Sequence, residues 1–561
     1  MTMDPMETYI SNAVFVPLRE PGERFTTYDY AIYVMMLVCS GVVGLYCAFV
    51  GGTEKTPRQL LSGDGNLSPL IVSMSLFASF TSATFIFGHA AEVYLNNTMI
   101  FIAVFSYCLT LFITASYFVP VFFELGVHST YQYLELRFSR SIRLIAAITH
   151  LVETTIYMGV ALYAPAFALS QLTGITISTA VCSIGLVCTI YTSIGGIKSV
   201  VYTDAFQCIV MLVAMAVVVV YGFAALGGVE RVWMLAQRGH RISFFNFSLN
   251  PTVRHTMWGL VLGTALTNAS SFAANNMMVL RYFTVPSLRA AKCIIWMNLP
   301  LLVAVLTLSC LSGLLVYARY YNCDPLTAHK VSTSDQLLPY FIFDVLSRRA
   351  GMSGLFVAGM FAASLSSVSS AVNAITYVLY IDVFLLVKPT MDAQSGVKVF
   401  IFLGIIVGLL PMVLVPIAEK IGRVLSAMIA VNSGLGGPLL GLFAVAIFFP
   451  TVNSTGAFCG FAVSLPFSLY LSVAPIVTGA QTYTPNNLSV KGCQEHFIFY
   501  NDTRKPKIVP DLGVEPIKRF RSWVINNFEG QRDHFDHLRR GRKRKNVSKQ
   551  ILERIKPTGK Q

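Results

Sequence analysis

Apolar residues in this chain come in runs of about 20, separated by short stretches that carry most of the charged and turn-forming residues. A run of this length lets an α-helix cross the hydrocarbon core of a bilayer, since each residue adds about 1.5 Å. The first run has no small-residue cleavage site after it, so it is expected to remain as a helix and not to act as a signal peptide. The pattern predicts an all-α, multi-pass membrane protein with spans near residues 28–50, 68–91, 98–125, 142–172, 175–193, 199–227, 255–280, 290–318, 352–386, 397–418, 422–449 and 455–478.

The basic residues of the short loops indicate how these spans are oriented. They follow the first, third and seventh runs, at Lys55, Arg58, Arg137, Arg140, Arg281, Arg289 and Lys292, whereas the loops after the second and fourth runs carry none. Because cytoplasmic loops are enriched in Lys and Arg, residues 1–27 are expected to lie outside. The sequons at Asn246 and Asn487 then fall in outside loops and are candidate N-glycosylation sites.

The overall composition supports a membrane protein, and the placement of its charge bears on its partners. Hydrophobic residues make up 55% of the chain and charged residues 12%, where a soluble domain carries about 25% charged residues. The net charge of +14 is concentrated in the polar tail, residues 479–561, which contains the run "RRGRKRK" (Arg539–Lys545). Beside a membrane, such a tail is expected to be solvated near anionic lipid, and nucleic acid is not expected as a partner.

Two features of the tail and loops stay open. Twelve spans starting from an outside N-terminus place the basic tail outside, although its charge favours the cytosol, so either a thirteenth span is missing or the tail topology differs. Most of the 11 cysteines lie inside apolar runs and are expected to be packed thiols. Cys323 and Cys493 lie in polar loops and can pair only if both loops are extracellular.

The spans between residues 28 and 478 divide into two five-helix halves, about 68–227 and 255–449, with extra flanking helices. Each half opens with an apolar helix interrupted by small and polar residues, "SLFASFTSAT" (Ser75–Thr84) and "TALTNASSFAANN" (Thr264–Asn276). Matching interrupted helices in two halves indicate a midplane binding site in transporters built from inverted repeats. The pattern therefore predicts a five-plus-five transport core.

The ninth run contains an unusual density of hydroxyls, "FAASLSSVSSAVN" (Phe361–Asn373). Ser366, Ser369, Ser370 and Asn373 recur at helical spacing and share one face. Small residues and hydroxyls are common where membrane helices pack closely, which is one interpretation. The other is a cation site, because a hard cation such as sodium takes oxygen ligands, by extension from calcium and magnesium.

Four further polar residues inside or beside the spans are candidates with competing interpretations. Asp204 marks an ion path, or else lies at the membrane junction with Thr203 or Lys198. Arg281 at the end of its span is interpreted as an interfacial side chain reaching toward water rather than a substrate contact. His150 and Glu153, three residues apart, form either a proton relay or a satisfied polar contact near the membrane surface.

The motifs resemble those of the sodium/solute symporter family, and within it the branch of sodium-coupled monocarboxylate, multivitamin and iodide transporters. The resemblance covers about residues 28–478 and is carried by "SLFASFTSATFIFG", "STYQYLELRF", "YAPAFAL", "GGIKSVVYTDAFQ", "NNMMVLRY", "YNCDPL", "DQLLPYFIFDVL" and "SLSSVSSAVNA". It implies a LeuT-like fold of five-plus-five inverted repeats that works by alternating access in the plasma membrane, without covalent chemistry.

The resemblance also implies a set of sodium ligands and an exit path. The family's two adjacent hydroxyl residues map to Ser366 and Ser367, beside the Ala363 carbonyl. The carbonyls of the first broken helix map to Ala78 and Thr81, and the aspartate of the "TD" motif near the sodium exit path maps to Asp204. Ser364, Ser369 and Ser370 are then left to helix packing.

The substrate side departs from the family pattern. Relatives often read N-Q-x-Q-V-Q-R-Y where this chain reads "NNMMVLRY", so Asn275 is kept while Met278 and Leu280 replace amides, and Phe85 replaces a small or polar residue. These changes predict a more apolar substrate pocket. The leading expectation is sodium-coupled import of a small organic anion such as a monocarboxylate. The alternatives are a vitamin or inorganic anion, a non-transporting sensor or scaffold, and a sodium-independent facilitator.

Overall fold

The structure is a computed structural model that describes residues 25–49, 60, 63–126, 129–250, 253–347, 349–388, 392–419, 429–478, 486, 488–490 and 493. Every regular element in this part of the chain is helical. The helices before residue 250 are α2 (Thr27–Phe49), α4 (Pro69–Phe80), α5 (Ala83–Leu95), α6 (Ala103–Ile113), α7 (Val119–Glu124), α8 (Thr130–Arg137), α9 (Arg140–Thr173), α10 (Ile177–Ala225) and α11 (Val229–Arg238). Those after residue 250 are α12 (Thr264–Ala269), α13 (Asn276–Tyr282), α14 (Leu288–Arg319), α15 (Leu337–Phe341), α16 (Met352–Val378), α17 (Leu385–Val387), α18 (Ala393–Glu419), α20 (Gly437–Phe448) and α21 (Ser454–Thr478).

Short helical segments of other pitch interrupt or join these helices. The 3₁₀ turns are η1 (Gly63–Gly65), η2 (Thr98–Ile102) and η6 (Ser334–Gln336). The π-helical segments are η3 (Thr114–Phe118), η4 (Gly259–Gly263), η5 (Ser270–Ala274), η7 (Ile342–Leu346), η8 (Leu379–Phe384) and η9 (Asn432–Gly436). Segments of this kind free backbone groups and are frequent at functional sites.

The predicted spans are found as helices, with two of them joined, except the run at 255–280. That run is not a candidate span, because it consists of short helical segments interrupted at Asn275, whose backbone angles are extended. Among the described residues, nine helices are long and apolar enough to cross a membrane, and the bent pair α4–α5 makes a tenth candidate span. α10 holds two of the predicted runs in 49 residues and is interrupted at Gly196, where φ is 61° and ψ is −156°. A side chain is excluded there as well, because a Cβ on Gly196 would lie 2.6 Å from the Leu60 carbonyl oxygen. The glycine thus turns one apolar stretch into two consecutive helices.

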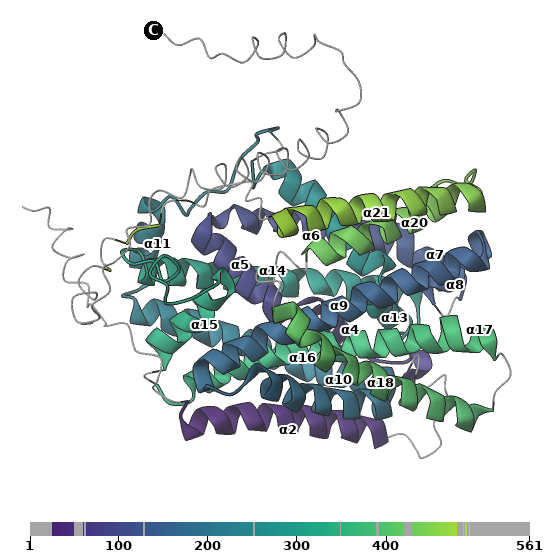
Figure 1. The fold of residues 1–561 in the computed structure, drawn as a ribbon, viewed down its shortest axis with the longest axis horizontal. Helices are drawn as coiled ribbons and strands as arrows, with labels where there is room; N and C mark the ends of the chain where they lie inside the picture. Colours follow the sequence, from purple (N-terminus) through teal and green to yellow (C-terminus); the bar gives the residue numbers. More distant parts are fainter. Residues whose placement is uncertain are drawn as a thin grey trace, which may run out of the picture. The chain divides into compact units, whose positions relative to one another are not determined.

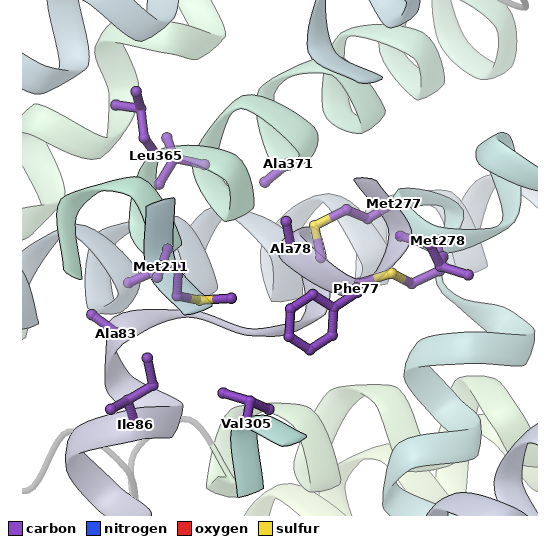
Figure 2. Packing of buried hydrophobic residues seen from close by; sticks show 14 of the residues in the cluster. Phe77, Ala78, Ala83, Ile86, Met211, Met277, Met278, Val305, Leu365 and Ala371 are labelled. Atoms are coloured by element: carbon purple, nitrogen blue, oxygen red, sulfur yellow. The ribbon is translucent and has the colours of Figure 1, made fainter. Parts of the chain in front are cut away.

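The interior is formed where the first helices of the two halves meet α16. α16 packs along α10 and α9, and both α4 and α13 contact it, while α2 packs against both α10 and α16 (Figure 1). Figure 2 shows Ala78 of α4, Met278 of α13 and Leu365 of α16 among the buried apolar side chains that surround the gap between α4 and α5. This packing holds the broken helix against the serine-rich helix.

The segment after α21 is attached to the end of the bundle where α5 ends. Cys493 forms a disulfide with Cys323, which follows α14. The Asn486 backbone amide donates to the Leu95 carbonyl at 3.1 Å, and its side-chain amide donates to the Asn96 carbonyl at 2.6 Å. The sequence left open whether Cys323 and Cys493 pair, and the structure pairs them. The basic-residue pattern predicts that this end of the bundle lies outside, where a disulfide can form. The run Arg539–Lys545 lies outside the described residues.

Of the two sequons, only the one at Asn246 lies among the described residues. Asn246 lies in the loop before η4, and its side-chain amide donates to the His255 carbonyl at 3.1 Å. Asn487 lies outside the described residues. Glycosylation at both positions stays a prediction.

Candidate functional site

The first candidate feature is the break between α4 and α5. Thr81 and Ser82 adopt extended backbone angles, and the two helices are bent by 59° at this point. The last carbonyls of α4, including those of Ala78 and Ser79, therefore lose the amide partners that a continuing helix would supply. Small and hydroxyl residues in "FASFTSAT" make this exposure of backbone oxygens sterically and chemically possible.

Two hydroxyls of α16 meet these freed carbonyls. The Ser366 hydroxyl lies 2.8 Å from the Ala78 carbonyl oxygen and 2.9 Å from that of Ala363. The Ser367 hydroxyl lies 3.2 Å from the carbonyl oxygens of Ser79 and Ala363. Four of the five residues expected to bind sodium are thus brought together from two helices that are distant in sequence.

The fifth residue, Thr81, lies in the break itself. Its side-chain oxygen is buried and has no hydrogen-bond partner among the described residues. This side-chain oxygen is therefore available to a ligand, in addition to the Thr81 carbonyl that the sequence analysis expected to bind sodium. No group of three or more His, Cys, Asp or Glu side chains that could hold a metal ion occurs in the described part of the chain, so a cation here would be bound by hydroxyls and carbonyls.

Asp204 is the centre of a second polar cluster, next to the first. Its side chain is fully buried and forms an ion pair with Arg281, with Nη2 and Oδ2 2.9 Å apart. Serine hydroxyls surround the carboxylate: Ser75 Oγ at 2.8 Å and Ser79 Oγ at 3.2 Å from α4, and Ser369 Oγ and Ser370 Oγ at 3.1 Å each from α16. Arg281 also donates to Ser75 Oγ at 2.8 Å and to Ser370 Oγ. The cluster joins α4, α10, α13 and α16.

Three interpretations from the sequence are wrong in light of this cluster. Arg281 is not an interfacial side chain, because it is 2% exposed and paired with Asp204. Asp204 is not a surface junction acid, and Thr203 donates to the carbonyls of Ser199 and Val200, not to Asp204. Ser369 and Ser370 do more than fill space, since both hydroxyls contact a buried charge. Spacing along single helices shows none of this, because the partners come from four different helices.

A cavity of about 400 Å³ lies beside the broken helix. Phe85, Asn275 and Met278 line it, as expected for residues on the substrate side, whereas Leu280 is buried and is not among the lining residues. The Phe85 ring packs against the His89 ring at a tilt, with ring centres 3.9 Å apart, and His89 Nδ1 lies 2.7 Å from the Phe85 carbonyl oxygen. Phe85 and Met278 give the cavity an apolar surface, with His89 beside it.

The cavity also includes an ion pair that the sequence analysis missed. Glu92 accepts two hydrogen bonds from Arg254, at 2.6 Å from Nε and 2.7 Å from Nη2, and His255 Nε2 lies 3.1 Å from the same carboxylate. The signal available was a carboxylate inside an apolar run, at Glu92, which is rare without a function or a partner. The partner lies more than 160 residues away in a loop and cannot be found by spacing.

Comparison with known proteins decides the family. The family model described as "Sodium:solute symporter family" matches residues 61–463. The chain belongs to the sodium:solute symporter family. Among relatives in this family, human "Sodium-coupled monocarboxylate transporter 1" is 38% identical over 85% of this chain and 78% of its own length. Mouse "Sodium-coupled monocarboxylate transporter 2" is 34% identical over 88% and 79%, and rabbit "Sodium-dependent multivitamin transporter" is 36% identical over 83% and 75%.

A solved structure confirms the fold of this symporter. A sodium-coupled sialic acid symporter in a substrate-bound, outward-open state matches with a TM-score of 0.70 at 22% identity, covering 83% of this chain and all of that one. The five-plus-five inverted-repeat fold is therefore established, as is a multi-pass, sodium-coupled solute symporter.

Proposed function

We propose that this symporter imports a small organic monocarboxylate with an apolar body across the plasma membrane. The observation that carries the proposal is the meeting of Ser366 and Ser367 with the freed carbonyls of the α4–α5 break, beside a cavity lined by Phe85 and Met278. The names of its relatives support both monocarboxylates and vitamins as substrate classes. The apolar wall favours a substrate whose body is hydrocarbon.

Sodium is proposed to bind the oxygens of Ala78, Thr81, Ala363, Ser366 and Ser367. At present each serine hydroxyl donates to carbonyls of both α4 and α16, so the two helices are already in register. A cation would take the same carbonyl oxygens and turn the hydroxyl lone pairs toward itself. Sodium would thereby tie the broken helix to α16 in one conformation and favour that conformation over the other. A difference of a few kcal/mol is enough to couple two sites.

The carboxylate of the substrate is proposed to meet the Asn275 amide. Asn275 caps α13, with its side-chain oxygen accepting the Met277 amide at 2.8 Å. Its NH₂ group therefore remains as a donor on the cavity wall, and Phe85 and Met278 contact the apolar part of the molecule. Leu280 would support this wall from behind, since it packs in the core.

Asp204 is proposed to lie on the path by which sodium leaves. Ser369 and Ser370 contact its carboxylate, and Ser369 lies 3.1 Å from the Ser366 carbonyl, which links the two clusters. With the N-terminus outside, α16 runs inward, so the Asp204 cluster lies on the cytoplasmic side of Ser366. A chain of oxygens in that direction offers sodium successive ligands.

The test is sodium activation of uptake in Ser366→Ala and Ser367→Ala at matched surface expression. Losing one oxygen ligand should raise the sodium concentration for half-maximal uptake about tenfold, equivalent to about 1.4 kcal/mol. Ser364→Ala is the matched control, because Ser364 lies on the same helix and its buried hydroxyl has no hydrogen-bond partner among the residues described. Sodium activation unchanged in both variants would refute the assigned ligands.

The substrate class is tested by sodium-dependent currents with a panel of short-chain carboxylates, vitamins, iodide and sugars. Currents with the carboxylates are expected. Currents only with vitamins or iodide would replace the proposed class, and uptake unchanged when choline replaces sodium would indicate a facilitator. No uptake of any member, with normal sodium binding, would favour a sensor.

A further inference from the structure

Glu153 is a buried carboxylate on the cavity wall for which the proposed cycle has no use. It lies in α9, is 4% exposed, and has no hydrogen bond or ion pair among the described residues. It is not the satisfied contact with His150 that its spacing suggested, because His150 Nδ1 lies 3.2 Å from the Thr154 hydroxyl instead. An unpaired carboxylate inside a membrane protein costs several kcal/mol unless a positive charge joins it.

Three oxygens from separate segments converge beside Gly436 of η9. A Cβ placed on Gly436 would lie 2.8 Å from Glu153 Oε1, 3.0 Å from Ser270 Oγ and 3.2 Å from Asn432 Oδ1. α9 contributes the carboxylate, while the two π-helical segments η5 and η9 contribute the hydroxyl and the amide. The three oxygens therefore cluster on the side of η9 that Gly436 leaves without a side chain, with Ser270 Oγ and Asn432 Oδ1 3.5 Å apart.

The orientation of the two neutral groups leaves their oxygens available. The Ser270 hydroxyl has the Thr267 carbonyl as its nearest acceptor, at 2.8 Å, so its lone pairs are free. The Asn432 NH₂ group donates to Ser271 Oγ at 3.1 Å, so its carbonyl oxygen is the atom turned toward Ser270 and Glu153. A carboxylate, an amide carbonyl and a hydroxyl are the oxygen ligands that hard cations take in proteins.

In the part of the chain that the structure describes, neither arginine near the cavity is available to balance Glu153. Arg254, the arginine that lines the same cavity, is already bound by both oxygens of Glu92. Arg281 is bound to Asp204 in the other cluster. Glu153 is therefore neutralised either by a proton or by a bound cation, and the three converging oxygens favour the cation.

We propose that Glu153, Ser270 and Asn432 bind a second sodium ion on the cavity wall. This site shares no residue with the set at Ala78, Thr81, Ala363, Ser366 and Ser367. The ion would join α9 to η5 and η9 and would neutralise Glu153. If the substrate is an organic anion, which rests on the proposed function, this neutralisation removes a repulsion inside the cavity, so sodium would bind here before the substrate.

The test is equilibrium binding of radioactive sodium to the purified full-length protein without substrate. Glu153→Gln is expected to bind one sodium ion fewer than the original protein, and Glu153→Asp to keep the ion with lower affinity. Gly436→Ala keeps all three ligands but places a methyl group against Glu153 Oε1, so it should also weaken this ion. Glu230→Gln is the matched control, because Glu230 is exposed on α11, and its sodium count should not change.

Each outcome separates this site from the proposed one. Loss of one ion in Ser367→Ala and of a different one in Glu153→Gln, additive in the double variant, supports two sites. If Ser366→Ala and Ser367→Ala both have no effect but Glu153→Gln loses an ion, the proposed sodium ligands on α16 fail and this inference stands. A full sodium count in monodisperse Glu153→Gln and Gly436→Ala overturns it. If the sodium count is unchanged and uptake loses its pH dependence, Glu153 carries a proton. If the sodium count is unchanged and only substrate affinity is weakened, Glu153 binds a donor group of the substrate. Either result overturns the sodium site.

Discussion

The buried charges of Asp204 and Arg281 should compensate each other, and a double-mutant cycle measures this coupling. Both side chains are almost fully buried, and the charged atoms lie 2.9 Å apart. Removing one partner of such a pair leaves an uncompensated buried charge and costs about 3–5 kcal/mol. Asp204→Asn and Arg281→Gln should therefore each lower the melting temperature of the detergent-purified protein substantially.

The double variant Asp204→Asn with Arg281→Gln should be less destabilised than the two single variants together. It leaves two neutral amides among the serine hydroxyls, so the penalty for an unpaired charge disappears, and the coupling energy should be at least about 2 kcal/mol. Asp344→Asn combined with Arg281→Gln is the control, because Asp344 is paired with Arg319 at 2.8 Å and not with Arg281. That combination should be additive.

The assay is heating of each variant followed by size-exclusion detection of the remaining monodisperse protein. Additive losses in the Asp204–Arg281 double variant would refute the reasoning, because they would mean that the two charges do not compensate each other. Sodium-dependent uptake should be lost in Asp204→Asn, since the carboxylate organises hydroxyls of both α4 and α16.

Three further predictions follow from single positions. Gly196→Ala should strongly reduce the amount of folded protein at the cell surface, because its φ of 61° and the Leu60 carbonyl 2.6 Å from the added Cβ both oppose a side chain; normal surface expression would contradict this. Cys323→Ser should free Cys493, so a membrane-impermeant maleimide should label intact cells above the background of the original protein; no added label would place Cys493 elsewhere. Phe85→Ala should raise the substrate KM about tenfold by removing an apolar wall, and an unchanged KM would remove Phe85 from the pocket.

The helical spans and the two-halved architecture could be predicted from sequence because they depend on local properties. A membrane span needs only a long enough apolar run, and the interruption of α4–α5 is visible in the small and hydroxyl residues around Thr81. The kink in α10 is equally local, since Gly196 can adopt a backbone conformation that other residues avoid. Motif resemblance then led to Ser366 and Ser367, which the structure places against the Ala78 and Ser79 carbonyls.

The partners of the buried charges were decided only by the tertiary structure. Arg281 has an ordinary interfacial position in its own span, and its pairing with Asp204, 77 residues away, depends on how α13 and α10 pack around α16. Glu153 likewise looked like half of a local pair with His150, yet its neighbours come from η5 and η9. The sequence by itself determined which segments cross the membrane and which residue types they carry, because hydrophobicity and backbone preference act locally. Packing alone decided which polar groups meet, since a buried charge is satisfied by whichever helix lies beside it and not by its neighbours along the chain.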